Sequence, residues 1–306
     1  MIFSPAKVQL VKRVPSGRGW LYEPKFDGYR GIVARESSGR VLIRSRNDKD
    51  LGRFFPELIR LAEMLPTGTV IDGEIVRPVV GGVSFVELQR RLMIPLKDRP
   101  SVAAERPVAF VAFDVLMDRS EDTRRLGLKV RRQRLERIVQ TANDSSLQLI
   151  LQTSEVAAAI GWLDDSLPMT GIEGVVAKRD EPYPRPNVRR WQKVRRTATM
   201  DVLIAGFIGD LPTPRLVVGT DDGGKLRILG TTLPISPEDA ARLEPLVPMA
   251  VRGERPIWSV FESERHDEWF QIPVGLMAEV AYSHLDGDRF RQAVRFLRWR
   301  LHQPPE

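Results

Sequence analysis

Cysteine is absent from this 306-residue sequence, and histidine occurs only at positions 266, 284 and 302. The lack of cysteine excludes disulfides, thiolate zinc sites and a cysteine nucleophile, and three scattered histidines argue against a structural metal cage. No stretch approaches the roughly 20 consecutive apolar residues of a membrane-spanning helix, and the N-terminus lacks a charged region followed by an apolar run. We therefore expect a cytoplasmic protein that does not act in a membrane.

Charge and length say more about the class of protein. The chain holds 47 lysines and arginines against 40 acidic residues, which gives a formal net charge of +7. A basic balance suits a polyanion such as nucleic acid, because binding it releases counterions, although the same charge can serve solubility alone. The 42% hydrophobic and 28% charged residues are ordinary for a globular protein, and a chain of this length predicts two domains.

The most informative segment is residues 23–30, with the sequence EPKFDGYR. Its Asp27-Gly28 pair, flanked by alternating apolar residues, is typical of a hairpin turn, which is the simplest interpretation. The second interpretation is that Lys25 is a covalent nucleophile. A lysine amine becomes nucleophilic when burial or neighbouring cations lower its pKa, and Arg30 could supply that field while Asp27 orients the amine.

The pattern Lys25-x-Asp27-Gly28-x-Arg30 resembles the first motif of the covalent nucleotidyltransferases, which comprise ATP-dependent DNA ligases, RNA ligases and mRNA capping enzymes. The resemblance implies that Lys25 is the catalytic residue and that Glu23 and Arg30 also contact the nucleotide. It implies an α+β nucleotidyltransferase (adenylation) domain with antiparallel sheets, followed by an all-β domain with the oligonucleotide-binding (OB) fold. The family's further motifs are then expected in order along the chain.

Apolar periodicity predicts the elements of the first domain. Residues 1–19, which proline and glycine interrupt, are expected to be irregular. Strands are expected at residues 20–25, 30–36, 40–45, 69–76, 108–116, 171–178 and 189–195. Helices are expected at residues 55–65 and 130–140, and from residue 84, with Ser84 as the cap.

Two acidic residues, Asp72 and Glu74, lie on one face of the strand expected at residues 69–76. Acidic groups in an apolar strand are costly unless they are paired, hydrated or functional, so a buried acid at a turn is the alternative to a functional site. By resemblance to the third family motif, Glu74 contacts the ribose or a metal-bound water. By resemblance also, Phe113 stacks on the purine, although an aromatic side chain in an apolar strand equally suits the core.

Residues 171–178 resemble the fourth family motif. Alternation places Glu173 on the face of Val175 and Ala177, and Lys178 on the opposite face; an ordinary ion pair is the alternative to a site. The resemblance implies that Glu173, with Glu74, holds a divalent metal, Mg²⁺ or Mn²⁺. It also implies that Lys178 reaches the phosphates of ATP.

Four further basic residues are candidates for phosphate contact. Arg44 and Arg46 alternate at the end of the strand expected at 40–45, so both would point to one side, toward phosphate or toward solvent. The resemblance places Arg46 beside the nucleotide and the nicked DNA, and the shared strand face makes Arg44 a second candidate for DNA contact. Lys193 and Arg195 share a strand face at positions where the family usually has two lysines, so the resemblance assigns both to the nucleotide. Arg195 keeps the charge in a wider group.

The pattern changes near residue 198, which predicts domains at 1–198 and 199–306. Strands expected at 200–207, 216–220, 225–230, 258–261 and 277–282, with a helix at 236–243 ended by Pro245, suit a small OB-type barrel. Residues 290–301 resemble the sixth family motif, whose basic residues approach the pyrophosphate of ATP. This resemblance assigns Arg298 to ATP and Arg295 and Arg300 to DNA; the alternative is a basic strand that touches only DNA. The acid and lysine that usually follow are missing after Leu301.

Taken together, the motifs resemble those of minimal bacterial ATP-dependent DNA ligases, similar to ligase C or the ligase module of ligase D. The resemblance implies nick sealing in DNA repair through a lysyl-AMP intermediate and a DNA-adenylate, with ATP and Mg²⁺ (or Mn²⁺) as cofactors. The expected partners are nicked duplex DNA and other repair or end-joining proteins, and the expected state is a monomer in the bacterial cytosol or on the nucleoid. The alternatives are an RNA ligase, a GTP-dependent capping-type enzyme and, from another class, a non-catalytic nucleic-acid-binding protein.

Overall fold

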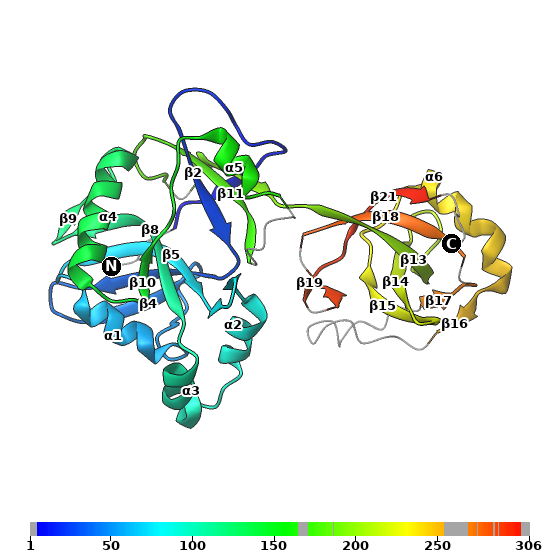
Figure 1. The fold of residues 1–306 in the computed structure, drawn as a ribbon, viewed down its shortest axis with the longest axis horizontal. Helices are drawn as coiled ribbons and strands as arrows, with labels where there is room; N and C mark the ends of the chain where they lie inside the picture. The colour runs from blue at the N-terminus through cyan, green and yellow to red at the C-terminus, as the bar shows by residue number, and fades with distance from the viewer. Residues whose placement is uncertain are drawn as a thin grey trace. The chain divides into compact units, whose positions relative to one another are not determined.

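The computed structural model of the protein describes residues 5–164, 171–185, 187–253, 269–273, 275–283, 285–286 and 288–300. The chain forms two compact units, Met1–Arg196 (unit 1) and Thr197–Glu306 (unit 2), which Figure 1 colours from blue to green and from green to red. Each unit has a hydrophobic core of its own. The division falls two residues before the boundary expected from the sequence.

Sheet A of unit 1 joins residues from both ends of the unit. Its strand order is β1-β12-β11-β2, in which β11 runs antiparallel to β2 and β12, whereas β1 runs parallel to β12. Its strands are β1 (Val8–Leu10), β2 (Trp20–Phe26), β11 (Ile172–Arg179) and β12 (Trp191–Arg195). The outer strand β1 corrects the expectation that residues 1–19 are irregular. Its pairing partner lies about 180 residues later, where a local pattern could not reveal it.

Sheet B of unit 1 has the order β10-β8-β5-β3-β4, with the short β9 beside β8. Its strands are β3 (Tyr29–Arg35), β4 (Val41–Ser45), β5 (Thr69–Val76), β8 (Ala109–Asp118), β9 (Glu121–Asp122) and β10 (Leu147–Leu149). Neighbouring strands are antiparallel, except that β10 runs parallel to β8. A small hairpin of β6 (Pro78–Val79) and β7 (Gly82–Val83) follows β5.

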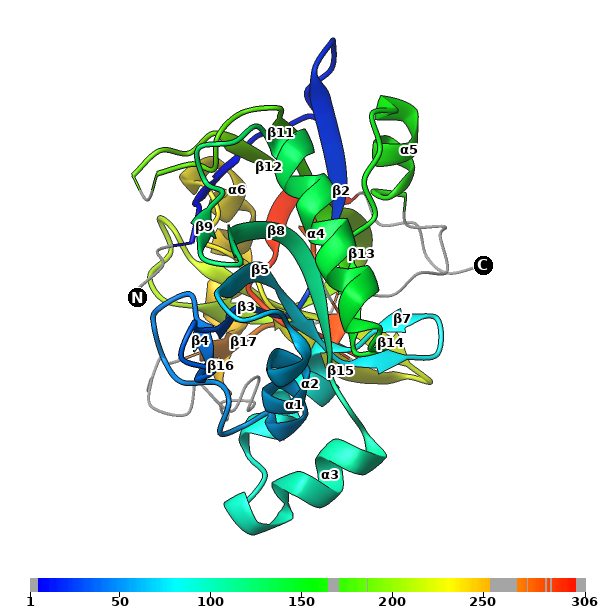
Figure 2. The same ribbon diagram turned by 90° about the vertical axis from the view of Figure 1, so that its left-hand side faces the viewer.

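Strand alternation gives sheet B two apolar faces. Val33, Ile71 and Phe110 point to the face that helices cover, and Figure 2 shows α1 and α4 in front of these strands. On the opposite face, Ile32 packs with Trp191 of sheet A. The helices of unit 1 are α1 (Pro56–Met64), α2 (Phe85–Leu92), α3 (Arg99–Glu105), α4 (Leu128–Ala142), α5 (Val156–Gly161) and the 3₁₀ helix η1 (Leu96–Asp98).

Sequence signals fix where these helices begin and end, and the three predicted helices of unit 1 are confirmed. α1 begins with Pro56, whose missing N–H costs nothing in a first turn. Ser84 caps α2 by accepting a hydrogen bond of 3.3 Å from the backbone N–H of Glu87. α4 ends at Asn143, which has the left-handed backbone (φ 43°) common at helix C-termini.

Unit 2 is organised by the long strand β13 (Ala198–Ile208). Its first half pairs with β18 and its last residues pair with β17, while β14 pairs along its other edge. The register to β14 shifts between Ile204 and Gly206, and a Cβ at Gly206 would overlap the carbonyl oxygen of Phe270. This bulge at a glycine bends β13 between its two partners.

The other strands of unit 2 are β14 (Arg215–Asp222), β15 (Lys225–Thr231), β16 (Val251–Arg252), β17 (Trp269–Gln271), β18 (Met277–Tyr282), β19 (Leu285–Asp286), β20 (Arg289–Phe290) and β21 (Arg295–Arg300). The helix expected at 236–243 is α6 (Pro237–Ala240), which continues into the 3₁₀ helix η2 (Ala241–Met249). Pro245 lies inside η2 rather than ending the helix. The strand expected at 258–261 lies outside the described residues.

None of the helices in the described ranges is long and apolar enough to cross a membrane.

Candidate active site

Lys25 lies near the end of β2, where the chain passes from sheet A to sheet B. β2 pairs with β11 and β3 pairs with β4 and β5, so Asp27-Gly28 connects two sheets, and the hairpin interpretation is wrong. A Cβ at Gly28 would overlap the carbonyl oxygen of Ile75. The backbone N–H of Asp27 donates to the carbonyl of Gly171 at 2.9 Å. This crossing places Lys25 at the seam between the sheets.

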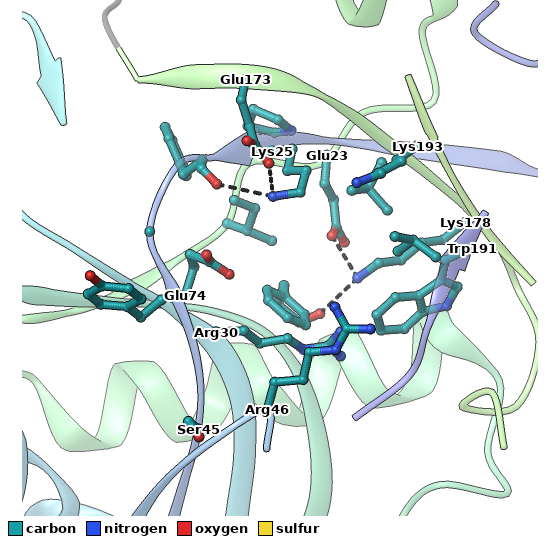
Figure 3. A pocket seen from close by; sticks show the side chains of 18 of the residues that line it. Glu23, Lys25, Arg30, Ser45, Arg46, Glu74, Glu173, Lys178, Trp191 and Lys193 are labelled. Atoms are coloured by element: carbon teal, nitrogen blue, oxygen red, sulfur yellow. Dashed lines mark hydrogen bonds and ion pairs between the residues drawn. The ribbon is translucent and has the colours of Figure 1, made fainter. Parts of the chain in front are cut away.

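A cavity of about 380 Å³ in unit 1 contains residues of both sheets (Figure 3). It collects most of the predicted site residues, namely Glu23, Lys25, Arg30, Arg46, Glu74, Phe113, Glu173, Lys178 and Lys193. Blocks that are up to 170 residues apart in the sequence therefore meet in one place, and the volume suits a small-molecule ligand.

Lys25 is held by acidic neighbours. Its Nζ forms an ion pair with Oε1 of Glu173 and lies 3.5 Å from the carbonyl oxygen of Phe26. Burial lowers the pKa of Lys25, but the carboxylates of Glu74, Glu173 and Asp27 together outweigh burial, and the net pKa is raised. The expectation of a pKa lowered by Arg30 is therefore wrong for the protein without ligand, because carboxylates, not cations, dominate the field.

Glu173 reaches the cavity through a β-bulge. The register between β11 and β2 shifts between Ile172 and Gly174, which makes Glu173 the extra residue. Val175 packs into the core behind the sheet, while Glu173 lines the cavity together with Lys178. Simple alternation had placed Glu173 and Lys178 on opposite faces, and the bulge corrects this.

Glu74 sits on β5 directly across from Arg30 of β3. Burial raises the pKa of Glu74 to about 7; Lys25 and Arg30 lower it, whereas the nearby Glu173 and Asp72 raise it further. A carboxyl group with a pKa near neutrality gains or loses its proton easily at physiological pH. Shifts of this kind cluster at functional sites.

Arg30 is fixed in one orientation by a buried network. Its Nε and one terminal nitrogen donate to the two carboxylate oxygens of Asp72 at 3.0 and 2.6 Å. Its other terminal nitrogen donates to the carbonyl of Ala6 at 2.5 Å. The Tyr183 hydroxyl donates to Asp72 at 2.6 Å and accepts from the N–H of Ala6 at 2.8 Å. Asp72, fully buried, is thus paired, as the cost of burying an unpaired acid requires.

A second buried pair lies at another part of the wall. Nζ of Lys178 is 2.6 Å from Oε2 of Glu23, and both side chains are almost fully buried. Gln152 donates to the other oxygen of Glu23 at 2.8 Å. The ammonium of Lys178 also lies 4.7 Å from the ring centroid of Phe113 and 4.1 Å from that of Trp191. Figure 3 shows the Glu23 carboxylate beside Lys178 and Trp191, with Lys25 to the left of Glu23 and Glu173 above Lys25.

The basic residues predicted to contact phosphate differ in their placement. Lys193 lines the cavity, and burial is the main cause that lowers its pKa; Arg195, Lys25 and Arg46 lower it further, against an opposing effect of Glu173. Arg195 is exposed at the end of β12 and, among the described residues, is not part of the cavity wall. Its charge therefore acts on the cavity from outside.

Arg44 and Arg46, at the end of β4 and just after it, also differ in their placement. β4 ends at Ser45, and Arg46 lies in the following turn, where it lines the cavity. Arg44 instead contacts Asp48, with 3.9 Å between Nε and Oδ1, and is not among the described residues of the wall. Alternation fails here because the strand ends between the two residues.

Three predicted residues belong to β21 in unit 2. Arg298 donates to Glu279 at 2.6 Å, and Arg300 donates to Asp201 at 2.8 Å. Arg295 is exposed on the same strand. The cavity in unit 1 is formed without them.

Sequence reasoning did not assign Trp191, which lines the cavity, or Tyr183 and Gln152, which do not line it but hold Arg30 and Glu23 by hydrogen bonds. Trp191 is two residues before Lys193 on β12, so the same alternation that pointed Lys193 inward could have identified it. Tyr183 and Gln152 come from segments between regular strands, and their local patterns carry no comparable signal.

The donor groups fit a magnesium ion that binds together with a nucleotide. Within the described ranges, no group of three or more acidic, histidine or cysteine side chains could hold a metal by itself. Two carboxylates, Glu74 and Glu173, flank Lys25. Mg²⁺ typically takes one or two carboxylates and completes its shell with water and substrate phosphates.

Comparison with known proteins agrees with this geometry. Residues 3–195 match the family model described as ATP dependent DNA ligase domain, and the chain belongs to this family. It is 33% identical to DNA ligase C1 of Mycolicibacterium smegmatis over 98% of this chain and 90% of that protein. It is 29% identical to DNA ligase C of Mycobacterium tuberculosis over 99% and 91% of the two chains.

A solved structure of a ligase domain is also similar to this chain. The chain resembles the crystal structure of the ligase domain of M. tuberculosis LigD with a TM-score of 0.51 and 26% identity, covering 97% of this chain and 95% of that one. The resemblance to ligase C and to the ligase module of ligase D that the motifs indicated is therefore confirmed.

Proposed function

We propose that the protein is an ATP-dependent DNA ligase that seals nicks in duplex DNA through a lysyl-AMP intermediate at Lys25. The observation that carries the proposal is the position of Lys25 in the cavity, between the carboxylates of Glu173 and Glu74, in a chain of this family. We propose that this nick-sealing activity serves DNA repair.

Unit 1 is proposed to be the adenylation domain and unit 2 an OB-fold domain. In support, β13, β14 and β15 form an antiparallel meander, and β18 and β21 extend the sheet from the other edge of β13. A parallel bridge between Thr232 and Val294 connects the chain just after β15 to the segment just before β21. A sheet whose two ends meet in this way is characteristic of small barrels.

In the first step, Nζ of Lys25 attacks the α-phosphorus of ATP and the bond to pyrophosphate breaks. The ammonium must lose a proton first, and Glu173, already paired with Nζ, is the nearest carboxylate to accept it. Lys193 and Arg46 line the same cavity and balance the charge that develops on the phosphate oxygens.

The second and third steps transfer AMP and join the strands. The 5′-phosphate at the nick attacks the phosphorus of lysyl-AMP, the N–P bond breaks, and Lys25 returns to its amine form. The 3′-hydroxyl then attacks the activated 5′-phosphate, AMP leaves, and a phosphodiester bond closes the nick. Arg44, Arg46, Arg295 and Arg300 are proposed to contact the DNA, and Arg298 the pyrophosphate of ATP.

The base is proposed to lie against Phe113 and close to the Glu23–Lys178 pair. A carboxylate oxygen of Glu23 accepts a hydrogen bond, so it favours the 6-amino group of adenine over the 6-oxo group of guanine. This preference supports ATP over GTP and weighs against a capping-type enzyme. Arg30, fixed by Asp72, is proposed to orient the ribose and phosphates.

Magnesium is the proposed metal, with Glu74 and Glu173 as its protein ligands. When bound with ATP it supplies charge neutralisation at the phosphates. The further proposals are a monomeric protein of the bacterial cytosol with nicked duplex DNA as its partner. Other repair or end-joining proteins are proposed to deliver that substrate.

The test is the intact mass of the protein after incubation with Mg²⁺ and either ATP or GTP. The protein is first treated with pyrophosphate, which removes any AMP already attached. We expect a gain of one AMP that acid releases, absent in Lys25→Ala and present in Lys129→Ala, a control on the exposed surface of α4.

Three other results would change the conclusion. A gain of GMP would indicate a capping-type enzyme. An adduct with AMP that transfers only to RNA ends would indicate an RNA ligase. The absence of any adduct would leave a nucleic-acid-binding protein without catalysis.

A further inference from the structure

A second basic site lies in unit 1 outside the nucleotide cavity. A depression beside α2 and the end of α3 is lined by four arginines, one acid and two apolar residues, namely Arg77, Arg90, Arg91, Arg106, Glu87, Ile94 and Val102. Figure 1 shows α2 and α3 at the lower edge of unit 1. None of the described residues of this depression lines the cavity around Lys25.

The positive groups of the depression exceed its negative ones. Glu87 forms an ion pair with Arg90 and lies 3.8 Å from a terminal nitrogen of Arg106, so it serves two guanidinium groups. Arg91 is buried, and its two terminal nitrogens donate to the two carboxylate oxygens of Glu57 at 2.9 and 3.1 Å. Arg77 forms no ion pair with any described residue, and its terminal nitrogen donates to the carbonyl of Pro78.

Two buried donors of this depression lack an acceptor. The Nε atoms of Arg77 and Arg91 are buried and have no hydrogen-bond partner among the described residues, and the Arg91 side chain is only 3% exposed. Burial is the main cause that lowers the pKa of Arg77; Glu87 opposes it, and Arg106 and Arg91 lower the pKa further. An anion bound in the depression would offset the repulsion between its guanidinium groups.

The depression lies one short stretch of strand away from the reaction site. Arg77 comes three residues after Glu74, a separation of about 10 Å along an extended chain. One strand of DNA carries a phosphate about every 3.4 Å along the helix axis, so the backbone between Glu74 and Arg77 is about as long as three nucleotides. The hairpin that follows Arg77 also packs with Val83 against Gly171, whose carbonyl holds Asp27 beside Lys25.

We propose that this arginine depression binds a backbone phosphate of the duplex within a few nucleotides of the nick and so anchors the DNA substrate. The inference rests on the proposed ligase function, to which it adds a contact surface on unit 1. Arg77 and Arg106 supply the binding charges. Arg91 holds the floor of the depression through Glu57.

The test compares two double variants with equal changes of charge. Arg77→Gln/Arg106→Gln removes two charges from the depression, and Arg60→Gln/Arg137→Gln removes two exposed charges from α1 and α4. Affinity for nicked duplex is measured by fluorescence anisotropy over a series of salt concentrations. For the first variant we expect about tenfold weaker binding at physiological salt and a slope of log K against log salt that is smaller by about 1, because one phosphate contact is lost.

Charge-neutral methylphosphonates then locate the contact. One methylphosphonate at a time replaces a phosphate one to four positions from the nick. At one of these positions the replacement should weaken binding by the wild type and leave binding by Arg77→Gln/Arg106→Gln unchanged. The variant Arg77→Lys/Arg106→Lys, which keeps both charges, should recover the salt slope. If the double glutamine variant has a lowered melting temperature, Arg106→Gln alone, at a half-exposed side chain, replaces it.

The inference is overturned if the salt slope of the depression variant equals that of the control, or if no methylphosphonate distinguishes it from the wild type. The gain of AMP in the absence of DNA separates this failure from failure of the proposed function. A wild type that takes up no AMP contradicts the ligase. If the wild type takes up AMP and seals nicks, and the depression variant binds DNA as tightly as the wild type does, only the phosphate site is contradicted.

Discussion

Glu74 is held where its ionised form is disfavoured, because burial raises its pKa to about 7 against 4.5 in an unfolded chain. The folded protein therefore binds this proton more tightly than the unfolded protein does. Below about pH 4.5 both states are protonated and Glu74 does not weaken the fold. As pH rises toward 7 the unfolded state ionises first, and the folded state loses stability relative to it.

Glu74→Gln should therefore stabilise the AMP-free protein in a pH-dependent way. At pH 8 we expect the variant to be more stable than the wild type by up to about 3 kcal/mol, because 1 pKa unit corresponds to 1.36 kcal/mol. At pH 4.5 the difference should be close to zero. Urea unfolding at both pH values measures it. Glu63→Gln, at an exposed carboxylate of α1, is the control, and a difference that does not grow with pH would contradict the prediction.

The same substitution should remove activity, because Glu74 is proposed to hold the metal. A gain of stability with a loss of activity is the pattern expected where a site is built against local stability. The raised pKa of Lys25 has the opposite effect on stability, since its carboxylate neighbours stabilise the ammonium form in the folded protein, and this form cannot attack.

At the scale of elements, Tyr183 connects two strands of unit 1 with the segment before β1. Its hydroxyl contacts Asp72 of β5, Arg30 of β3 and, next to β1, the backbone of Ala6. The network holds sheet B and the first residues of the chain in one arrangement around Arg30. Tyr183 therefore acts by positioning Arg30, with its own ring packed at 5.4 Å from that of Trp191.

Tyr183→Phe should lower the free energy of unfolding by about 1.5–3 kcal/mol, the value of a hydrogen bond to a charged group. Tyr22→Phe is the matched control, because the Tyr22 hydroxyl donates to a neutral carbonyl, that of Pro15, at 2.7 Å. The control should lose about 0.5–1.5 kcal/mol. Tyr183→Phe should also raise the KM for ATP, which Tyr22→Phe should not. Equal effects of both variants on stability and KM would argue against a positioning role.

The elements of unit 1 were largely predictable, because their signals are local. Ser84 as a helix cap and the apolar run of β5 each depend on a few adjacent residues. The strand β1 was not predictable, since its three residues become a strand only through pairing with β12. The bulge at Glu173 was also hidden, because it depends on the register with β2. Resemblance to the family motifs thus named the candidate site residues, and pairing between distant strands decided which of them face the cavity.

At the scale of the whole molecule, two cores imply two unfolding transitions. The buried clusters of unit 1 and unit 2 share no residue, and multi-domain proteins commonly depart from two-state unfolding. The nucleotide cavity lies within unit 1. A ligand of the cavity therefore stabilises the unit that binds it.

AMP added to Lys25→Ala, which cannot form the covalent adduct, should raise the transition of unit 1 and leave that of unit 2 in place. At 100 times the Kd the expected stabilisation is about 2.7 kcal/mol. Calorimetry of the full chain with and without AMP measures it. GMP is the control nucleotide. A single transition that moves as one, or equal shifts of two transitions, would contradict the prediction.

Trp191 has one more consequence, which is optical. Its indole forms part of the wall of the nucleotide cavity, with the ammonium of Lys178 4.1 Å from the ring centroid and the ring of Phe113 at 6.0 Å. Indole emission responds to nearby charge and to the exclusion of water. The protein thus carries an intrinsic fluorophore in its own binding site, so that the difference in emission between wild type and Trp191→Phe follows the filling and emptying of the cavity without any added label.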